Sequence, residues 1–159
     1  MFFIKERGYP IINSKYLLSN AGEIYNNTFD GGEQLYLTKS DRHIFIDLNS
    51  STLECYGITV IIDAFKFTVI DFNLKPSMDI SLFYKKPDNS NKLLFLNDFN
   101  LKCYVDYKNH LVMFGDIDAE GNCCQYFKDT YCVFSNQNIK LIILKVDNDI
   151  LNYIKTRHT

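Results

Sequence analysis

A chain of 159 residues, with 47% hydrophobic and 23% charged residues, has the size and composition of one globular domain, so we expect a single domain over residues 1–159. Its formal net charge of −2 argues against a nucleic-acid partner, because neutralising phosphates requires a basic surface. The opening MFFIKERGYP has too short an apolar run for a signal peptide, and no segment reaches the roughly 20 apolar residues of a membrane span, so we expect no membrane partner.

Short runs of β-branched and aromatic residues dominate the chain and are separated by Asn, Asp, Ser, Gly and Pro. In chain order, the expected strands lie within residues 2–7, 9–18, 34–39, 43–48, 52–72, 80–86, 93–99, 101–107, 110–117, 123–127, 130–134 and 139–146. Turn signals recur about every 8–12 residues, which is typical of a sandwich, a barrel or a strongly curved sheet. The predicted fold class is therefore mainly β (β-rich α+β), an antiparallel meander with a short C-terminal helix.

Several short segments are expected to bend or turn the chain. In the longest apolar run, Gly57 favours a bulge and Asp63 favours a second break. Residues 87–91, PDNSN, have the composition of a loop between two strands. Lys108 and Asn109 suit a tight hairpin turn, because Asn tolerates a positive φ.

Two segments are candidates for helices. Residues 19–27, SNAGEIYNN, are polar and poorly patterned, whereas the tail 147–159 carries stronger signals. Asp147 or Asn148 can cap the tail, and its apolar residues at i, i+1 and i+4 share one face. We expect the tail to form a short helix that packs on the sheet.

The segment 115–122, GDIDAEGN, is the first candidate for a functional site. Asp116, Asp118 and Glu120 stand at alternate positions, as in the first half of an EF-hand calcium loop. The twelfth position of that motif requires a bidentate Glu, but here it is Phe127. The sequence therefore predicts no metal site in this segment.

A hairpin explains the same segment better. We expect a strand over 111–117, a turn over 119–122 and a return strand over 123–127, with Gly121 taking a positive φ. The three carboxylates would then face solvent. An acidic tip of this kind can still meet a partner.

The cysteines and histidines show no catalytic or metal-binding motif. Cys123 and Cys124 are neighbours in an expected strand, so they should point to opposite faces, one in the core and one exposed. A cysteine nucleophile needs a His within hydrogen-bond reach, but His43, His110 and His158 stand in no recognisable arrangement. The five Cys have no zinc-type spacing, and no Gly-rich phosphate loop is present. We therefore expect no catalytic residue, metal or cofactor, and reduced thiols in a cytoplasmic protein.

Tyrosine is frequent in the expected strands, and the chain has 11 Tyr and 13 Phe but no Trp. Exposed tyrosines make binding platforms, by packing at protein interfaces or by stacking on single-stranded nucleic acid. Packing in the core is the alternative for the same residues. The segment QYFKDTY supplies Tyr126 and Tyr131 as candidates for such a platform.

The chain is small and mildly acidic, with expected reduced thiols and no catalytic signature, and it has acidic tips in GDIDAEGN and VDND and interleaved tyrosines in QYFKDTY. In this profile it resembles the bacterial immunity proteins that neutralise a cognate toxin. Those of contact-dependent growth inhibition systems are an example. The resemblance is one of whole-chain profile, and no motif carries it. It implies a non-catalytic protein-binding module that occludes a protein toxin, for instance a nuclease. Asp116, Asp118 and Glu120 would meet the toxin's basic cleft, while Tyr126 and Tyr131 supply affinity.

Two other functions stay open at this stage. An antiparallel β-barrel can carry a small apolar ligand in its interior. An enzyme with a dispersed site can also be built on a β scaffold, since fold does not fix function.

Overall fold

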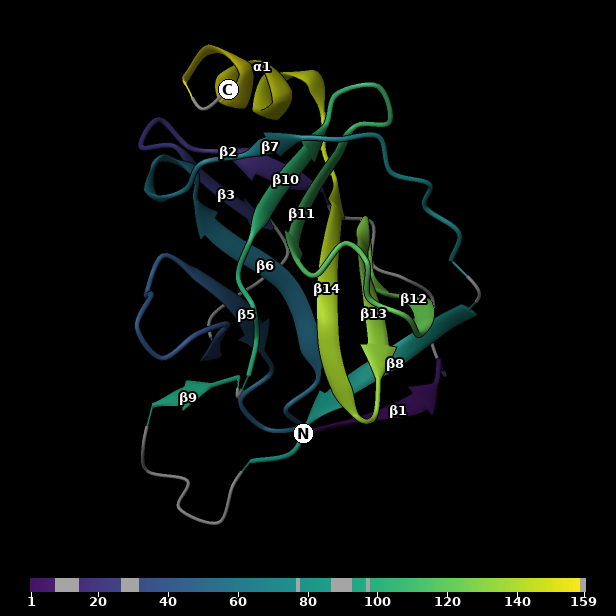
Figure 1. Ribbon diagram of the computed structural model, residues 1–159. Coiled ribbons are helices and arrows are strands. Elements are labelled where there is room, and N and C mark those ends of the chain that lie inside the picture. The colour runs from purple at the N-terminus through teal and green to yellow at the C-terminus, as the bar shows by residue number, and fades with distance from the viewer. Residues whose placement is uncertain (8–14, 27–31, 77, 87–92, 97, 158–159) are drawn as a thin grey trace.

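The computed structural model describes residues 1–7, 15–26, 32–76, 78–86, 93–96 and 98–157. Its strands form two mixed β-sheets that stack on each other, and one short helix covers an end of the stack (Figure 1). The expectation of a mainly β chain with a short C-terminal helix is confirmed. Of the three architectures left open by the sequence, the structure adopts a sandwich.

The larger sheet has eight strands. In spatial order they are β1 (Phe2–Glu6), β8 (Met78–Tyr84), β12 (Asn122–Phe127), β13 (Thr130–Ser135), β14 (Asn138–Lys145), β11 (Leu111–Gly115), β10 (Cys103–Asp106) and β7 (Thr68–Val69). Neighbours are antiparallel except for the pairs β8–β12 and β7–β10. Strands β11 to β14 form a Greek key, because β12, β13 and β14 are consecutive neighbours and β11 lies beside β14.

The smaller sheet has six strands. In spatial order they are β2 (Tyr16–Leu18), β3 (Glu23–Asn26), β6 (Cys55–Ile61), β5 (Ile44–Leu48), β4 (Glu33–Tyr36) and β9 (Leu94–Phe95). The register between β5 and β6 shifts by one residue next to Gly57, since Ile46 faces Ile58 while Leu48 faces Cys55. This bulge confirms the prediction at Gly57. The break expected at Asp63 is also confirmed, because the 3-10 helix η1 (Ile62–Ala64) ends β6.

Apolar side chains from both sheets fill the space between them. Fully buried members include Ile24, Ile46, Ile58, Val60, Val112, Phe114, Cys124, Cys132 and Ile142. Tyr16 of β2 joins the sheets, because its hydroxyl accepts a hydrogen bond from the Ile58 N–H (3.1 Å) and contacts Thr130 Oγ1 of β13. A packed interior between two sheets, in the part of the chain that is described, offers no barrel lumen for a carried ligand.

Helix α1 (Asn148–Arg157) confirms the prediction for the tail. Asp147 caps it, since its Oδ1 accepts a hydrogen bond from the Ile150 N–H at 3.1 Å. The buried face of α1 consists of Ile150, Leu151 and Ile154, which join the core. Among the described residues, no helix is both long and apolar enough to cross a membrane.

The weaker helix candidate and one predicted turn are not observed. The described part of the candidate segment, residues 19–26, contains no helix, because Glu23–Asn26 forms β3 between β2 and β6 and buries Ile24 in the core. The hairpin turn predicted over 115–122 is wrong. Strand β11 pairs with β10 and β14, whereas β12 pairs with β8 and β13, so the chain crosses β14 and β13 between them.

The turn predicted at Lys108 and Asn109 is confirmed, since Asp106 pairs with Leu111 in the hairpin of β10 and β11. His110 takes the positive φ of 59° there, in the place expected for Asn. The loop predicted over 87–91 lies outside the described residues, as does the part of the expected strand 9–18 that precedes residue 15.

Candidate functional site

The outward face of the larger sheet is apolar at its centre. Six side chains on β11, β13 and β14 are buried there: Leu111, Met113, Tyr131, Val133, Leu141 and Ile143. A solvent-facing sheet surface is normally polar, so this face needs a cover. Two irregular segments supply it, which we call the strap (residues 70–76) and the crossover loop (residues 116–121).

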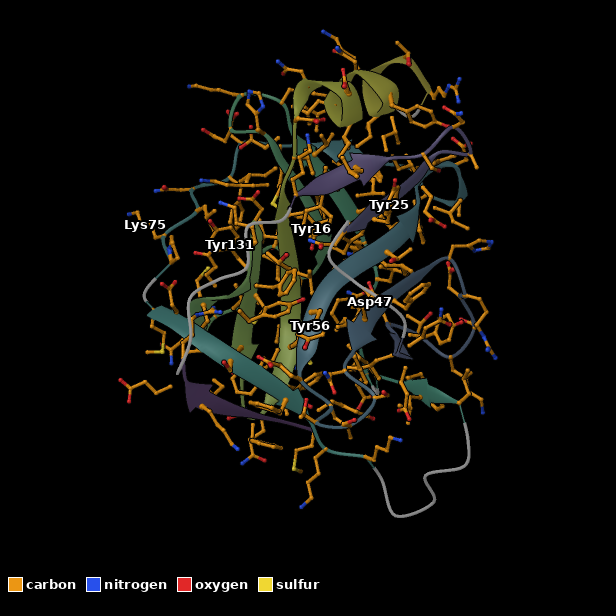
Figure 2. All side chains as sticks on the ribbon, turned by 180° about the vertical axis from the view of Figure 1, so that it is seen from behind. Tyr16, Tyr25, Asp47, Tyr56, Lys75 and Tyr131 are labelled. Carbon is orange, nitrogen blue, oxygen red and sulfur yellow. The ribbon has the colours of Figure 1, made fainter. Side chains whose placement is uncertain are left out.

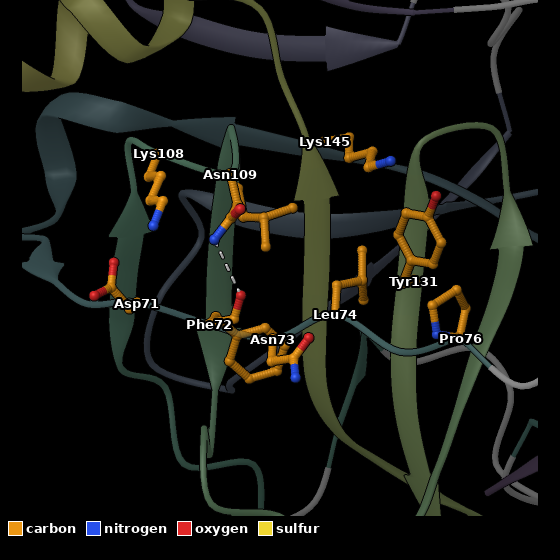
Figure 3. Close-up of a pocket in the computed structure, with 10 residues that line it drawn as sticks. Asp71, Phe72, Asn73, Leu74, Pro76, Lys108, Asn109, Tyr131 and Lys145 are labelled. Carbon is orange, nitrogen blue, oxygen red and sulfur yellow. Dashed lines mark hydrogen bonds between the residues drawn. The ribbon is translucent and has the colours of Figure 1, made fainter.

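The strap runs across the strands of the larger sheet (Figure 3). Ile70, Phe72 and Leu74 pack on the outer apolar cluster, while Asp71 and Asn73 between them are exposed. The strand expected to continue to residue 72 ends at Val69 of β7, and the strap beyond it still alternates between the sheet and solvent. In the described chain, backbone pairing with β10 ends with the bond from the Ile70 N–H to the Val105 carbonyl oxygen (3.0 Å), and the rest of the strap covers the sheet.

The buried Asp106 holds the strap to the hairpin of β10 and β11. Its Oδ2 accepts hydrogen bonds from the Phe72 N–H (2.8 Å) and from Asn109 Nδ2 (2.7 Å), and its Oδ1 accepts one from the Asn109 N–H (3.0 Å). Asn109 Nδ2 also donates to the Phe72 carbonyl oxygen at 3.3 Å (Figure 3). Burial raises the pKa of Asp106, but the hydrogen bonds from Asn109 and Phe72 outweigh it, so the net shift of this pKa is downward.

The crossover loop places its acidic and apolar side chains on opposite sides. Ile117 and Ala119 pack on the outer cluster, whereas Asp116, Asp118 and Glu120 are exposed. The carboxylates thus face solvent as predicted. Among the described residues, none of the three forms an ion pair.

Backbone hydrogen bonds fix the shape of the crossover loop. The Asp116 N–H donates to the Lys140 carbonyl oxygen of β14 (3.0 Å), and Asp116 Oδ1 accepts a bond from the Asp118 N–H (2.9 Å). Gly121 serves a close approach, because a Cβ at this position would lie 2.6 Å from the Phe134 carbonyl oxygen. The three carboxylates are therefore carried on an anchored segment.

A cleft of about 550 Å³ opens between the strap and the ends of β11, β13 and β14 (Figure 3). Phe72 and Leu74 of the strap and Leu111 of the sheet give it apolar walls. Lys145 and Tyr131 line it from the sheet. The volume lies within the range typical of sites for small molecules.

The two tyrosines predicted to bind a partner lie in different environments. Tyr131 lines the cleft, and 6% of its surface is exposed. Tyr126 is 1% exposed and lies between the sheets, where burial raises the pKa of its hydroxyl well above the usual range. This placement corrects the expectation for Tyr126: it is a core residue whose phenol does not reach the surface.

The adjacent cysteines point to opposite faces, as predicted. Cys124 is buried in the core, and Cys123 is half-buried against the outer cluster. Burial raises the pKa of Cys123 to about 11 and that of Cys103 to about 12, so both thiols are protonated at neutral pH and poorly nucleophilic. His43 pairs with Asp41 on the surface (Nδ1 to Oδ1, 2.8 Å).

In the described part of the chain, no group of three or more His, Cys, Asp or Glu side chains is placed to hold a metal ion. His158 lies outside the described residues. The cleft, its lysines and the Asp106 contacts were not predicted from the sequence. One signal for a covered outer face was present, since the continuous apolar runs LVMF (111–114) and LIIL (141–144) are typical of strands buried on both faces.

Comparisons with known proteins add no assignment to this geometry. No protein-family model matches the chain, and no curated protein matches it significantly.

Proposed function

We propose that the protein is a non-catalytic protein-binding module, an immunity protein that binds and occludes a cognate bacterial toxin in the cytoplasm. The crossover loop is the observation that carries this proposal. It presents Asp116, Asp118 and Glu120 to solvent from a segment anchored by Ile117 and by bonds to β14. A fixed set of charges loses little conformational freedom on binding, which favours affinity.

The proposed mechanism is occlusion of a basic active-site cleft, such as that of a nuclease. Carboxylates on the crossover loop attract the positively charged cleft and set the orientation of the encounter. Tyr131 lies beneath the strap on the same face of the sheet and is the aromatic residue retained from the predicted set. Tyr126 takes no part in the proposed surface because it is buried.

The test measures association with the product of the adjacent upstream gene, which in this proposal encodes the toxin. Asp118→Lys with Glu120→Lys reverses two charges and leaves Asp116, whose carboxylate shapes the loop. We expect association at low salt to slow by roughly tenfold or more and to lose much of its salt dependence.

The matched control is Glu6→Lys with Asp149→Lys, which changes the net charge equally at exposed positions outside the crossover loop. It should affect the association rate much less. An unchanged rate in the loop variant removes the loop from the interface. Calorimetry that detects no complex with the wild-type chain counts against the toxin partner itself.

A further inference from the structure

The cleft under the strap carries positive charge in a chain whose net charge is negative. Lys108 and Lys145 line it against one carboxylate, Asp71. Within the described residues, neither lysine forms an ion pair. A cationic pocket of this kind favours an anionic ligand.

The charges are not evenly placed. Figure 3 shows Lys108 and Asp71 at one end of the cleft, where Asn109 ties the hairpin to the strap, and Lys145 and Tyr131 at the other. An acid and a base lie together at the first end. The second end holds a cation and a phenol, with no carboxylate among the residues that line the cleft there.

The sheet register explains why Lys145 and Tyr131 lie on the same face of the sheet. Tyr131 faces Ile143 across β13 and β14, and Lys145 lies two residues further along β14, on the same face. Leu111 of β11 pairs with Lys145 from the other side and forms the apolar floor beside it. The three side chains are thus held on rigid strands, while the Asp106 contacts fix the strap above them.

We propose that this cleft binds a small organic anion with an apolar body of about the size of one ring. Lys145 attracts its carboxylate, sulfonate or phosphate group, and the Tyr131 hydroxyl donates a hydrogen bond to it. Leu111, Phe72 and Leu74 enclose the apolar body. A lysine binds these groups as a point charge, so the site selects charge and size more than the geometry of the acid.

The crossover loop contributes no residue to the cleft, so Tyr131 is the one residue that the cleft shares with the proposed interface. Asp129 and Asp147 border Lys145 on its other side, in a separate hollow of about 200 Å³. The experiment must therefore show that the ammonium acts on a ligand in the cleft and not only on these carboxylates.

Titration of the full chain with phenylacetate, followed by ¹H–¹⁵N correlation spectra, tests the site without any variant. We expect saturable shifts at the amides of Leu111, Tyr131 and Lys145, with a dissociation constant on the order of millimolar for so small a probe. The neutral isostere 2-phenylacetamide should bind roughly fivefold more weakly, and phenethylamine more weakly still. Acetate and inorganic phosphate, which lack the apolar body, should also bind more weakly than phenylacetate.

Three substitutions locate the charge. Lys145→Gln should weaken phenylacetate binding by roughly fivefold and leave 2-phenylacetamide unaffected, and Tyr131→Phe should weaken it by at least about twofold. Lys108→Gln, at the other end of the same cleft, is the matched control and should change it by less than about twofold. Any one of three results would overturn the proposal. They are equal affinity for phenylacetate and 2-phenylacetamide, equal affinity for acetate and phenylacetate, and an unchanged affinity of the Lys145→Gln protein for phenylacetate.

Discussion

Asp47 provides the most direct test of the physical reasoning, because it is a buried carboxyl group that forms no ion pair with any described residue. It lies on β5 of the smaller sheet (Figure 2), and 2% of its surface is exposed. Its Oδ2 accepts a hydrogen bond from Thr59 Oγ1 at 3.1 Å. Burial raises the pKa of Asp47, the Thr59 bond lowers it and the charge of Glu23 raises it, which brings the pKa to about 7.

The raised pKa makes stability depend on pH in a stated direction. The folded chain binds this proton more tightly than the unfolded chain, in which the group titrates near 3.8. The associated stability is therefore complete below about pH 4, declines as the pH rises to about 7, and is constant above that value. A shift of about three pKa units, at about 1.4 kcal/mol each, gives an upper value of about 4 kcal/mol.

Asp47→Asn removes the titration and keeps a side-chain oxygen for the Thr59 hydroxyl. Urea unfolding at intervals from pH 4 to pH 9 should show a variant that is more stable than the wild type at pH 8, by about 2–4 kcal/mol. The two should converge near pH 4. Asp118→Asn, at an exposed position, is the control and should retain the wild-type slope. If the wild type and Asp47→Asn show equal slopes between pH 5 and pH 8, the carboxylate is ionised in the folded state and the reasoning fails.

Two further predictions concern the contacts that hold the layers together. Tyr16→Phe should lower the free energy of unfolding by about 1–3 kcal/mol in urea titrations, because the Ile58 N–H and the Thr130 hydroxyl lose a buried partner; an unaltered value would mean that water replaces it. Asp106→Asn should release the strap, raising hydrogen exchange at the Phe72 amide by roughly tenfold while exchange in β6 stays unchanged. Because the pKa of Asp106 is lowered in the folded chain, ionisation of this carboxyl stabilises the fold. That stabilisation is complete above the unfolded-state pKa and is lost as the pH falls through the folded-state pKa. The unfolding free energy of Asp106→Asn should therefore lack this decline in acid.

The sequence predicts strand positions well because strands are marked by local composition, but it does not fix which strands pair. The segment between β11 and β12 illustrates the difficulty. Its Gly and Asp residues are typical of a hairpin, and adjacent strands along a chain often pair. Here β11 and β14 are apolar on both faces, so alternation does not set which face is inward, and β11 is buried best between β10 and β14.

Tertiary burial also explains why the weaker helix candidate does not form and why the prediction for Tyr126 is wrong. The segment 19–27 has only weak helical signals, and Ile24 gains more by entering the core as part of β3 than a short polar helix gains from local bonds. Tyr126 of β12 and Tyr131 of β13 lie on consecutive strands but on opposite faces of the larger sheet, Tyr126 in the core and Tyr131 in the cleft. Both faces there are apolar, so sequence alone could not decide which tyrosine remains accessible.

The exposure of Asp116, Asp118 and Glu120 was predictable because three carboxylates close together in a polar segment are costly to bury, whereas single carboxylates such as Asp47 and Asp106 can be buried with hydrogen-bond partners. The cleft was not, since it depends on the strap crossing strands from distant parts of the chain. The same outer apolar cluster accounts for both the exposed carboxylates and the cleft. Ile117 and Ala119 are required to cover it, and so are Phe72 and Leu74, while the alternate positions on each segment face outward. The exposed residues of both segments can therefore change in charge without altering the packing beneath them.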